Sequence, residues 1–250
     1  MDKGYIKSTN NYLIPYVSEI TGNENLVVVI SHGFGSSKAS PTAQMMLHRL
    51  SAIGIGAVAY DFPAHGDSTA AGDFLRIRNC IDDLDAVRSF AAESAPDADI
   101  SYFSSSFGAY ISLQYLSESE FRNARVFCRS AAVNMPALFA HPTPQEVKNF
   151  DEFGFNIVDH GYSRPLKITT DFISDLEERD LFHIYRPGCA DIKMIHGEKD
   201  EVINIKYAEQ FAELSGAELT IVPEGDHQLS GPGMPEQAAS EALDFFLRRP

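Results

Sequence analysis

The sequence predicts an α/β protein in which helices flank a mostly parallel β-sheet. Apolar runs alternate along the chain with segments of helical spacing, which is the pattern of consecutive strand–helix units. The run at residues 25–31 (NLVVVIS) is continuously apolar, as is typical of a parallel strand that is buried on both faces. The 250 residues, 44% of them hydrophobic, suit one large α/β domain or a core with a small insertion.

The individual elements follow from these two patterns. Residues 77–95 illustrate the helical one, because Ile77, Ile81, Leu84, Val87 and Phe90 recur at helical spacing. The predicted strands are 25–31, 55–60, 98–103, 124–133, 191–195 and 218–222. The predicted helices are 42–52, 77–95, 107–117, 168–182, 205–214 and 236–248.

The alternation stops between residues 136 and 187, where aromatic and turn-forming residues are frequent. We interpret residues 136–187 as a small inserted cap, or lid, over a core that consists of residues 1–135 and 188–250. An ordinary long excursion of the core is the alternative. Residues 168–182 are the one helix predicted inside this segment.

Composition excludes several classes of protein. A net charge of −15 repels phosphate backbones, so we expect no nucleic-acid partner. No apolar stretch reaches 18 residues, so we expect no membrane span. The cysteines are Cys80, Cys128 and Cys189, an odd number without a C-x-x-C pair, which predicts neither a disulfide framework nor a cysteine zinc site. With no apolar signal core at the N-terminus, the sequence favours a cytoplasmic location.

A candidate nucleophile lies between the strand at 98–103 and the helix at 107–117. Residues 104–108 (SSSFG) have the form small-x-Ser-x-small, which is the pattern of a nucleophile elbow. The turn is sharp and needs small residues on either side, so the frame of Ser104 and Gly108 selects Ser106 over Ser105. The first small residue of such elbows is usually glycine, and a plain serine-rich turn is the alternative.

Acyl transfer also requires donors for an oxyanion, an acid and a base. The amides of Phe34, in the glycine-bearing loop after the first predicted strand, and of Phe107 are the candidate oxyanion donors, although a glycine-rich turn would look the same. Asp200 is the candidate acid in the spacing H-G-x-x-D-x-x-I, ahead of Glu198 and Glu201. His227, after the last strand, is the candidate base.

The order of these residues carries more weight than any one of them. Serine, acid and histidine each stand just past the end of a predicted strand, which is the order of the α/β-hydrolases. Asp226 is a fallback acid, but a residue adjacent to His227 rarely points at the same ring.

The chain resembles an α/β-hydrolase over nearly its whole length. The residues that carry the resemblance are SHGFG (31–35), YDFPAHGDS (60–68), SSSFGA (104–109), HGEKDEVI (196–203) and GDHQLS (225–230). The resemblance implies an α/β-hydrolase fold, that is, an eight-stranded, mostly parallel sheet with helices on both faces and a small inserted cap. It also implies a structural role for the loop at 60–68, where Ala64 and His65 replace the usual glycines. The finer similarity is to cinnamoyl/feruloyl esterases and monoacylglycerol-lipase-like enzymes.

The expected activity is that of a serine carboxylesterase that forms an acyl-enzyme on Ser106 and needs no metal or organic cofactor. The expected substrate is a small-molecule ester with an apolar or aromatic acyl group, because the segment 136–187 is rich in aromatic residues. The candidate substrate-binding residues are Met135, Phe139, Phe155 and Tyr162. A thioesterase, an amide hydrolase and a non-catalytic binding protein of the same fold remain alternatives. A homodimer is left open.

Overall fold

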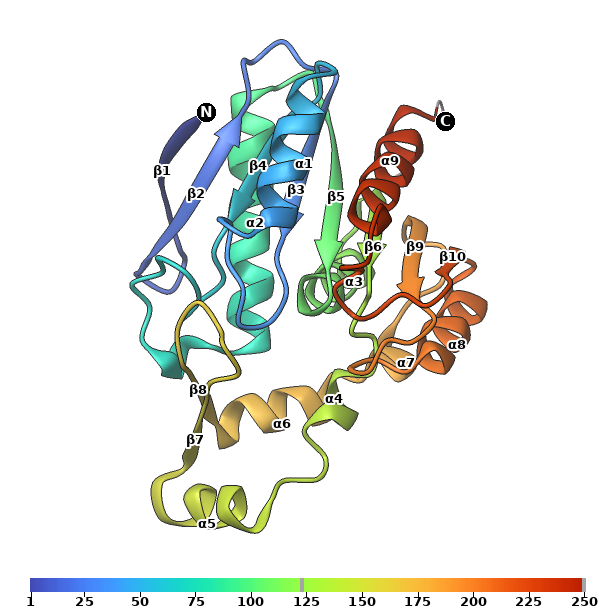
Figure 1. Ribbon diagram of the computed structural model, residues 1–250. Coiled ribbons are helices and arrows are strands. Elements are labelled where there is room, and N and C mark those ends of the chain that lie inside the picture. The colour runs from blue at the N-terminus through green and yellow to red at the C-terminus, as the bar shows by residue number, and fades with distance from the viewer. Residues whose placement is uncertain (122–123, 249–250) are drawn as a thin grey trace.

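The computed structural model describes residues 1–121 and 124–248, and it confirms the eight-stranded sheet (Figure 1). The strand order is β1-β2-β4-β3-β5-β6-β9-β10. The strands are β1 (Asp2–Lys7), β2 (Leu13–Glu19), β3 (Leu26–Ser31), β4 (Gly56–Tyr60), β5 (Asp99–Ser105), β6 (Arg125–Arg129), β9 (Asp191–Gly197) and β10 (Glu218–Val222). From β4 to β10 all neighbours pair parallel, whereas β1 and β2 pair antiparallel with each other, and β2 with β4.

Strand β3 shows why the parallel strands read as continuously apolar runs. Val27 and Val29 belong to one hydrophobic cluster, whereas Val28 and Ile30 belong to a second cluster on the opposite face of the sheet. Because helices cover both faces, every position of the strand is buried. The pattern of burial in β1 and β2 includes exposed and half-exposed positions, so these two strands give no such run.

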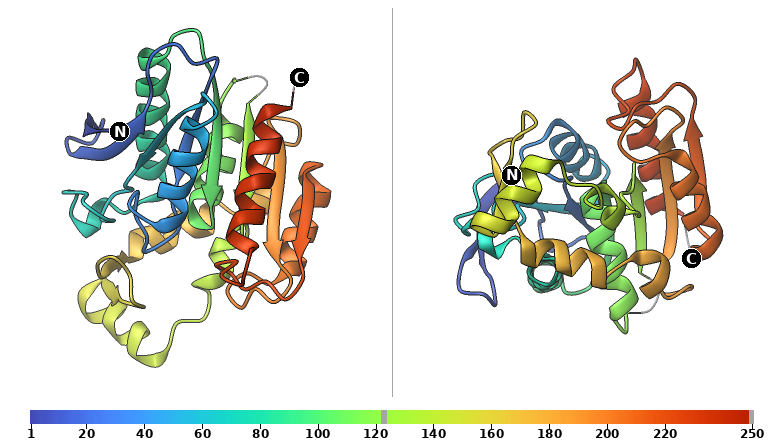
Figure 2. Two further views of the ribbon diagram at one scale, coloured as in Figure 1. Left: turned by 45° about the horizontal axis from the view of Figure 1, so that its top comes forward. Right: turned by 90° about the horizontal axis from the view of Figure 1, so that it is seen from below.

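The helices lie in two layers, as predicted (Figure 2). Helices α1 (Pro41–Ser51) and α9 (Met234–Leu247) pack together on one face, where their buried residues share a cluster. Helices α2 (Ile77–Ser94), α3 (Phe107–Glu118) and α8 (Ile205–Ser215) contribute to the cluster on the other face. A 3₁₀ turn, η1 (Gly72–Phe74), precedes α2.

Between β6 and β9 the chain leaves the main sheet and forms a group of short elements beyond the carboxyl ends of the strands (Figure 1). They are α4 (Met135–Leu138), α5 (Pro144–Phe153), β7 (Phe155–Val158), β8 (Leu166–Thr169), α6 (Thr170–Glu178) and α7 (Leu181–Ile184). Strands β7 and β8 form a separate antiparallel hairpin.

The helix predicted at 168–182 is wrong at its start and in its middle. It begins only at Thr170, because residues 166–169 form β8, and Thr169 caps α6 by accepting a hydrogen bond from the Phe172 amide. It breaks after α6, where Asp180 caps α7. Leu176 and Leu181 are buried in the same cluster as α2 and α3, so α6 and α7 pack directly on the core.

A buried carboxyl group ties the N-terminal hairpin to α2. Ser8 Oγ and Tyr12 Oη each donate to a different oxygen of Asp83 at 2.7 Å. Burial raises the pKa of Asp83 to about 7, although the two hydrogen bonds act in the opposite direction.

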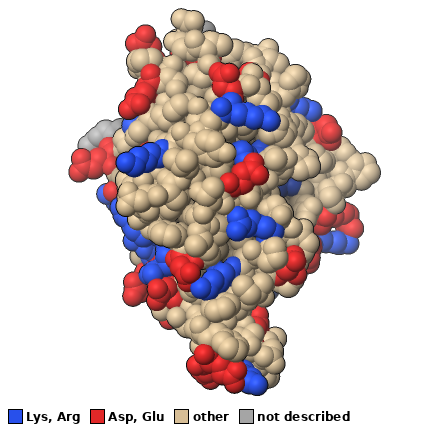
Figure 3. Space-filling view, turned by 90° about the vertical axis from the view of Figure 1, so that its left-hand side faces the viewer, with Lys and Arg blue, Asp and Glu red and all other residues tan. Residues whose placement is uncertain are grey.

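The surface carries charges of both signs. Figure 3 shows acidic and basic side chains interspersed on the face near β1 rather than gathered into one field. None of the helices in the described part of the chain is both long and apolar enough to cross a membrane.

Candidate active site

Ser106 lies at the junction of β5 and α3, in a strained backbone conformation. Its φ of 49° and ψ of −113° are unusual for a residue with a side chain. The neighbouring backbone holds it there: Ser106 N donates to Arg129 O at 2.9 Å, and Ser106 O accepts from Ala109 N at 3.0 Å and Ala132 N at 3.2 Å. This is the geometry of the sharp turn that the sequence predicts.

The residues that frame Ser106 explain the local sequence. A Cβ at Gly108 would lie 2.6 Å from Ser31 O and 2.7 Å from His32 O, so only glycine fits there. Ser104 stands where glycine is usual, and its fully buried hydroxyl shares a 2.8 Å hydrogen bond with the Ser112 hydroxyl on α3. The buried Ser104 hydroxyl therefore has a hydrogen-bond partner.

The structure brings Ser106, His227 and Asp200 together from three loops. His227 Nε2 lies 3.0 Å from Ser106 Oγ, and His227 Nδ1 lies 2.7 Å from Asp200 Oδ2. His227 follows β10, and Asp200 follows β9, so both reach Ser106 across the carboxyl ends of the parallel strands.

Asp200 is held on both of its oxygens. Oδ1 accepts from Val202 N at 2.9 Å and Ile203 N at 2.7 Å, whereas Oδ2 faces His227 Nδ1 and also lies 3.1 Å from His196 Nε2. Burial acts to raise the pKa of Asp200, but the hydrogen bonds from His196 and His227 outweigh it and hold the pKa well below its usual range. Asp200 therefore stays ionised at neutral pH.

The competing carboxylates have other partners. Glu198 accepts from Glu224 N at 3.1 Å, and Glu201 accepts from the backbone N of His227 at 3.4 Å. The carboxylate of Asp226 binds the amide and hydroxyl of Ser230. Of the candidates from the sequence, only Asp200 reaches the His227 ring in the described chain.

His196 is a residue of the site that sequence reasoning missed. In the segment HGEKD (196–200) the sequence singles out only the acid, yet His196 is fully buried, and its Nε2 lies 2.9 Å from Ile203 O as well as 3.1 Å from Asp200 Oδ2. Because a carbonyl can only accept, His196 Nε2 carries a hydrogen and donates.

Phe34 and Phe107, the candidate oxyanion donors, both lie close to Ser106. Phe107 is the first residue of α3, and the loop before Phe34 approaches Ser106 so closely that a Cβ at Gly33 would lie 3.4 Å from Ser106 Cβ. Within the described residues, neither the Phe34 amide nor the Phe107 amide has a hydrogen-bond acceptor. Both are free to bind a ligand oxygen.

His32 orients this loop, a role that the sequence did not indicate. His32 Nδ1 lies 2.8 Å from Gly33 O, and Phe62 N donates to His32 Nε2 at 3.2 Å, so Nδ1 carries the hydrogen. Burial lowers the pKa of His32 to about 4 and keeps the ring neutral. In a trans peptide the N–H points away from the C=O, so fixing Gly33 O also fixes the direction of the Phe34 N–H.

The loop at 60–68 packs against the site through the His65 ring, which contacts the rings of Phe34 and Phe107. Asp61 accepts from Lys38 N at 2.7 Å and Lys38 Nζ at 2.6 Å, both buried. The His65 ring is fully buried and stacks on Phe107 at a centroid distance of 6.4 Å.

A cavity of about 680 Å³ opens from Ser106 toward the elements between β6 and β9. Three of the four predicted substrate-binding residues, Met135, Phe139 and Tyr162, line it. Phe155 does not: its ring packs on Phe153 and under Lys167 Nζ instead. Lining residues that the sequence did not single out as substrate-binding are Leu138, His141, Pro142, Glu146, Phe150, Asn156, Val158, His160, Ile168, Ile173, Glu201, Val202 and Gln228.

Comparison with known structures shows the same fold. A putative hydrolase from Agrobacterium vitis S4 aligns with a TM-score of 0.86 and 17% identity, over 98% of each chain. Alpha/beta hydrolase domain-containing protein 10 from mouse aligns with a TM-score of 0.78 and 15% identity, again over 98% of each chain. Est1E from Butyrivibrio proteoclasticus, in a structure with ferulic acid bound, aligns with a TM-score of 0.77 and 15% identity, over 98% of this chain and 100% of Est1E.

Sequence comparison gives the family. No curated protein matches the chain. A family profile described as serine aminopeptidase, S33, matches residues 22–180, which is more than half of the chain. The chain therefore belongs to this family of hydrolases within the α/β-hydrolase superfamily.

Proposed function

We propose that the protein is a serine hydrolase that cleaves carboxylic esters, with Ser106 as nucleophile, His227 as base and Asp200 as the acid that orients the base. The observation that carries this proposal is the unbroken hydrogen-bond chain from Asp200 Oδ2 through His227 to Ser106 Oγ, with steps of 2.7 and 3.0 Å. This series of hydrogen bonds ends at the Ser106 hydroxyl, which lines a cavity large enough for a small ester.

The reaction follows from this geometry. His227 Nε2 takes the proton from Ser106 Oγ as the oxygen attacks the ester carbonyl. The proton then passes to the leaving alcohol as the C–O bond breaks, which leaves Ser106 acylated. Water adds to the acyl-enzyme with His227 again as base, and the acid is released as Ser106 recovers its proton.

The carbonyl oxygen becomes negatively charged in both steps. The Phe34 and Phe107 amides, which have no acceptor within the described residues, are the proposed donors to it. Asp200 holds His227 in the tautomer with hydrogen on Nδ1, leaving Nε2 as acceptor for Ser106. The ionised Asp200 also stabilises the imidazolium that forms.

The proposed acyl group is apolar or aromatic and occupies the 680 Å³ cavity. Aromatic rings support this assignment: Phe34, Phe139, Phe150 and Tyr162 all line the cavity, and the Phe139 and Tyr162 rings each lie 6.0 Å from Phe34. The proposed cap, residues 136–187, supplies most of this lining. Its elements α6 and α7 are packed on the core through Leu176 and Leu181.

Labelling by a fluorophosphonate probe tests the proposal. Wild-type protein and Ser105→Ala should label, whereas Ser106→Ala should not label and should lose about 10⁴-fold or more in kcat. Labelling that survives Ser106→Ala would refute the assignment of the nucleophile. A folded wild-type protein that never labels would support a binding protein instead.

A panel of leaving groups tests the ester assignment separately. The panel comprises p-nitrophenyl, feruloyl and monoacylglycerol esters, an acyl-CoA thioester and an anilide with a common or closely similar acyl group. The proposal requires the highest kcat/KM on an oxygen ester. A higher kcat/KM on the thioester or the anilide would move the protein to the thioesterases or the amide hydrolases with the same triad.

A further inference from the structure

A second cavity, of about 460 Å³, also reaches Ser106, and most of its lining residues differ from those of the first. It shares Phe34, Ser106, His227 and Gln228 with the first cavity, so the two meet at the proposed nucleophile. An ester has two halves, and a site with two cavities can hold one half in each. The chemistry of the two linings then indicates which half enters which cavity.

The two linings carry opposite charges. In the part of the chain that the structure describes, the first cavity is lined by the carboxylates of Glu146 and Glu201 and by no lysine or arginine. The second is lined by Arg129 and, among the described residues, by no carboxylate. The chain has a net charge of −15, so a cavity that reaches Ser106 and is lined by a cation, with no carboxylate among its described lining residues, is unusual in this protein. An anionic group would be repelled from the first cavity and attracted to the second.

Arg129 has donors to spare. It is the last residue of β6, and its Nη2 donates to Gln228 O, in the loop that carries His227. No carboxylate in the described chain lies within ion-pair distance of its guanidinium, which has five N–H donors. Asp226 and Asp200 are near enough to act on its charge, but burial outweighs them and lowers the pKa of Arg129.

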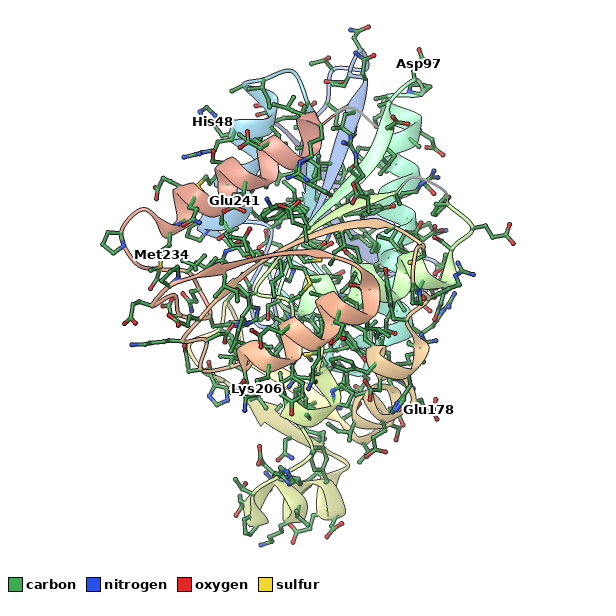
Figure 4. The ribbon with its side chains drawn as sticks, turned by 90° about the vertical axis from the view of Figure 1, so that its right-hand side faces the viewer. His48, Asp97, Glu178, Lys206, Met234 and Glu241 are labelled. Atoms are coloured by element: carbon green, nitrogen blue, oxygen red, sulfur yellow. The ribbon has the colours of Figure 1, made fainter. Side chains whose placement is uncertain are left out.

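The backbone adds to the same field. Pro41, Thr42 and Ala43 in the first turn of α1, together with Pro235 in the first turn of α9, also line the second cavity. Both helices begin at the end of the sheet where the parallel strands finish (Figure 1), and Figure 4 labels Met234 at the start of α9. A helix N-terminus carries a partial positive charge, so two of them reinforce the preference of Arg129 for an anion.

We propose that the second cavity binds an anionic group, a carboxylate or a phosphate, on the alcohol half of the ester, and that Arg129 is the residue that recognises it. The inference rests on the proposed function, and it narrows the substrate to an ester that joins an apolar acid to an anionic alcohol. A carboxylate or phosphate can accept two parallel hydrogen bonds from one guanidinium, which a neutral alcohol cannot match.

Four esters test the proposal. Three share a 4-phenylbutyryl acyl group and differ in the alcohol, which is glycerol, glycerate or glycerol 3-phosphate. The fourth, the glycerol monoester of glutaric acid, has its charge on the acyl half. The readout is the ratio of kcat/KM for each charged ester to kcat/KM for the neutral one, which cancels any general loss of activity.

The wild-type ratio should exceed one for glycerate, for glycerol 3-phosphate or for both, and the larger ratio identifies the preferred anion. Arg129→Gln should reduce that ratio by about 10- to 100-fold, the scale of a hydrogen bond to a charged group. Thr42→Glu should reduce it too by placing a carboxylate in the same cavity, and an acid is well tolerated in the first turn of a helix. Arg125→Gln is the matched control, because it removes the same charge from β6 at a place where the side chain binds Phe245 O and Arg248 O.

The outcomes separate the inference from the proposed function. Unchanged ratios in Arg129→Gln and Thr42→Glu, with hydrolysis still dependent on Ser106, would overturn the inference and leave the proposed function standing. A preference for the glutarate ester that is lost in Arg129→Gln would show that the halves are assigned the wrong way round. Should Arg129→Gln fail to fold, Thr42→Glu decides alone. If none of the four esters is hydrolysed in a reaction that depends on Ser106, both the inference and the proposed function are refuted.

Discussion

Replacing Asp200 by Asn should nearly abolish activity, for a reason that can be read from its hydrogen bonds. The backbone amides of Val202 and Ile203 both donate to Oδ1, so the carbonyl oxygen of an Asn side chain is required at that position. The amide nitrogen must then occupy the position of Oδ2, where it faces His227 Nδ1 and His196 Nε2. A donor there forces the hydrogen of the neutral His227 ring from Nδ1 to Nε2.

The size of the effect follows from the other end of the ring. With a hydrogen on Nε2, His227 can no longer accept the proton of Ser106, whose Oγ lies 3.0 Å away. In other triads the wrong tautomer costs on the order of 10³–10⁴ in kcat, or about 4–5.5 kcal/mol. The alternative rotamer of Asn would restore the tautomer but would leave two backbone donors without an acceptor, which costs about 1–3 kcal/mol for each.

The assay is kcat on a p-nitrophenyl ester at neutral pH, with far-ultraviolet circular dichroism to show that the variant is folded. Asp226→Asn and Glu201→Gln are the controls, since each removes one nearby negative charge, and both should retain activity to within about tenfold. A folded Asp200→Asn enzyme with near-wild-type kcat would refute the assignment of the acid. Loss of activity in Asp226→Asn alone would transfer that role to Asp226.

Three further changes test other parts of the molecule. Gly108→Ala should push α3 away from Ser31 O and lower kcat by about 10²-fold, as a misplacement of the nucleophile by nearly 1 Å can do. A wild-type kcat would show that the turn at Ser106 accommodates the added Cβ. Phe150→Ala should reduce the preference for 4-phenylbutyryl over acetyl esters by about tenfold, because Phe150 lines the first cavity. Phe153→Ala on the same helix should not, because Phe153 is 62% exposed and lies outside that cavity. Equal effects of the two changes would remove α5 from the substrate site. Asp83, with its pKa raised to about 7, contributes stability that is present below about pH 4 and is lost as the pH rises through 7. Urea unfolding should therefore show the stability of Asp83→Asn relative to wild type increasing by about 2–4 kcal/mol from pH 4 to pH 8. Parallel pH profiles of the two proteins would contradict the raised pKa.

Sequence patterns were sufficient to predict those elements whose residues are chosen by burial alone. The parallel strands are buried on both faces, so residues such as Val28 and Val29 had to be apolar whatever the details of packing. The order of Ser106, Asp200 and His227 past the strand ends predicted which loops would meet, because parallel strands all finish at one edge. The antiparallel hairpins β1–β2 and β7–β8 escaped this reasoning, since each has exposed positions and gives no continuous run.

Phe155 shows where composition misleads. The aromatic content of the segment suggested that Phe155 contacts the substrate, but β7 is a strand, and side chains alternate between its faces. Asn156 and Val158 line the cavity, while Phe155 and Ile157 lie on the other side and Ile157 is 59% exposed. A shift of one residue in register decides this outcome, and four residues of sequence are too few to fix it.

His32 and His196 could not be found from the sequence for a different reason. Each acts on the backbone or on another side chain of the site rather than on the substrate, so its role depends on which atom it faces. His32 binds Gly33 O, and His196 donates to Ile203 O and Asp200 Oδ2. In the sequence both are simply histidines followed by glycine at the end of a strand.

These two histidines bear on how ready the site is to react. The strained turn at Ser106, the Gly33–Phe34 peptide fixed by His32, and the four-donor environment of Asp200 are all held by hydrogen bonds within the protein itself. Donors that are already aimed at the place where charge develops need no reorganisation in the transition state, which is the main source of electrostatic stabilisation in enzymes. Among the described residues, those of α4, α5 and β7 contribute no hydrogen bond to this set. We therefore expect them to select the acyl group while small esters react without them, so that changes such as Phe150→Ala alter specificity and changes at Asp200 alter the rate for every substrate.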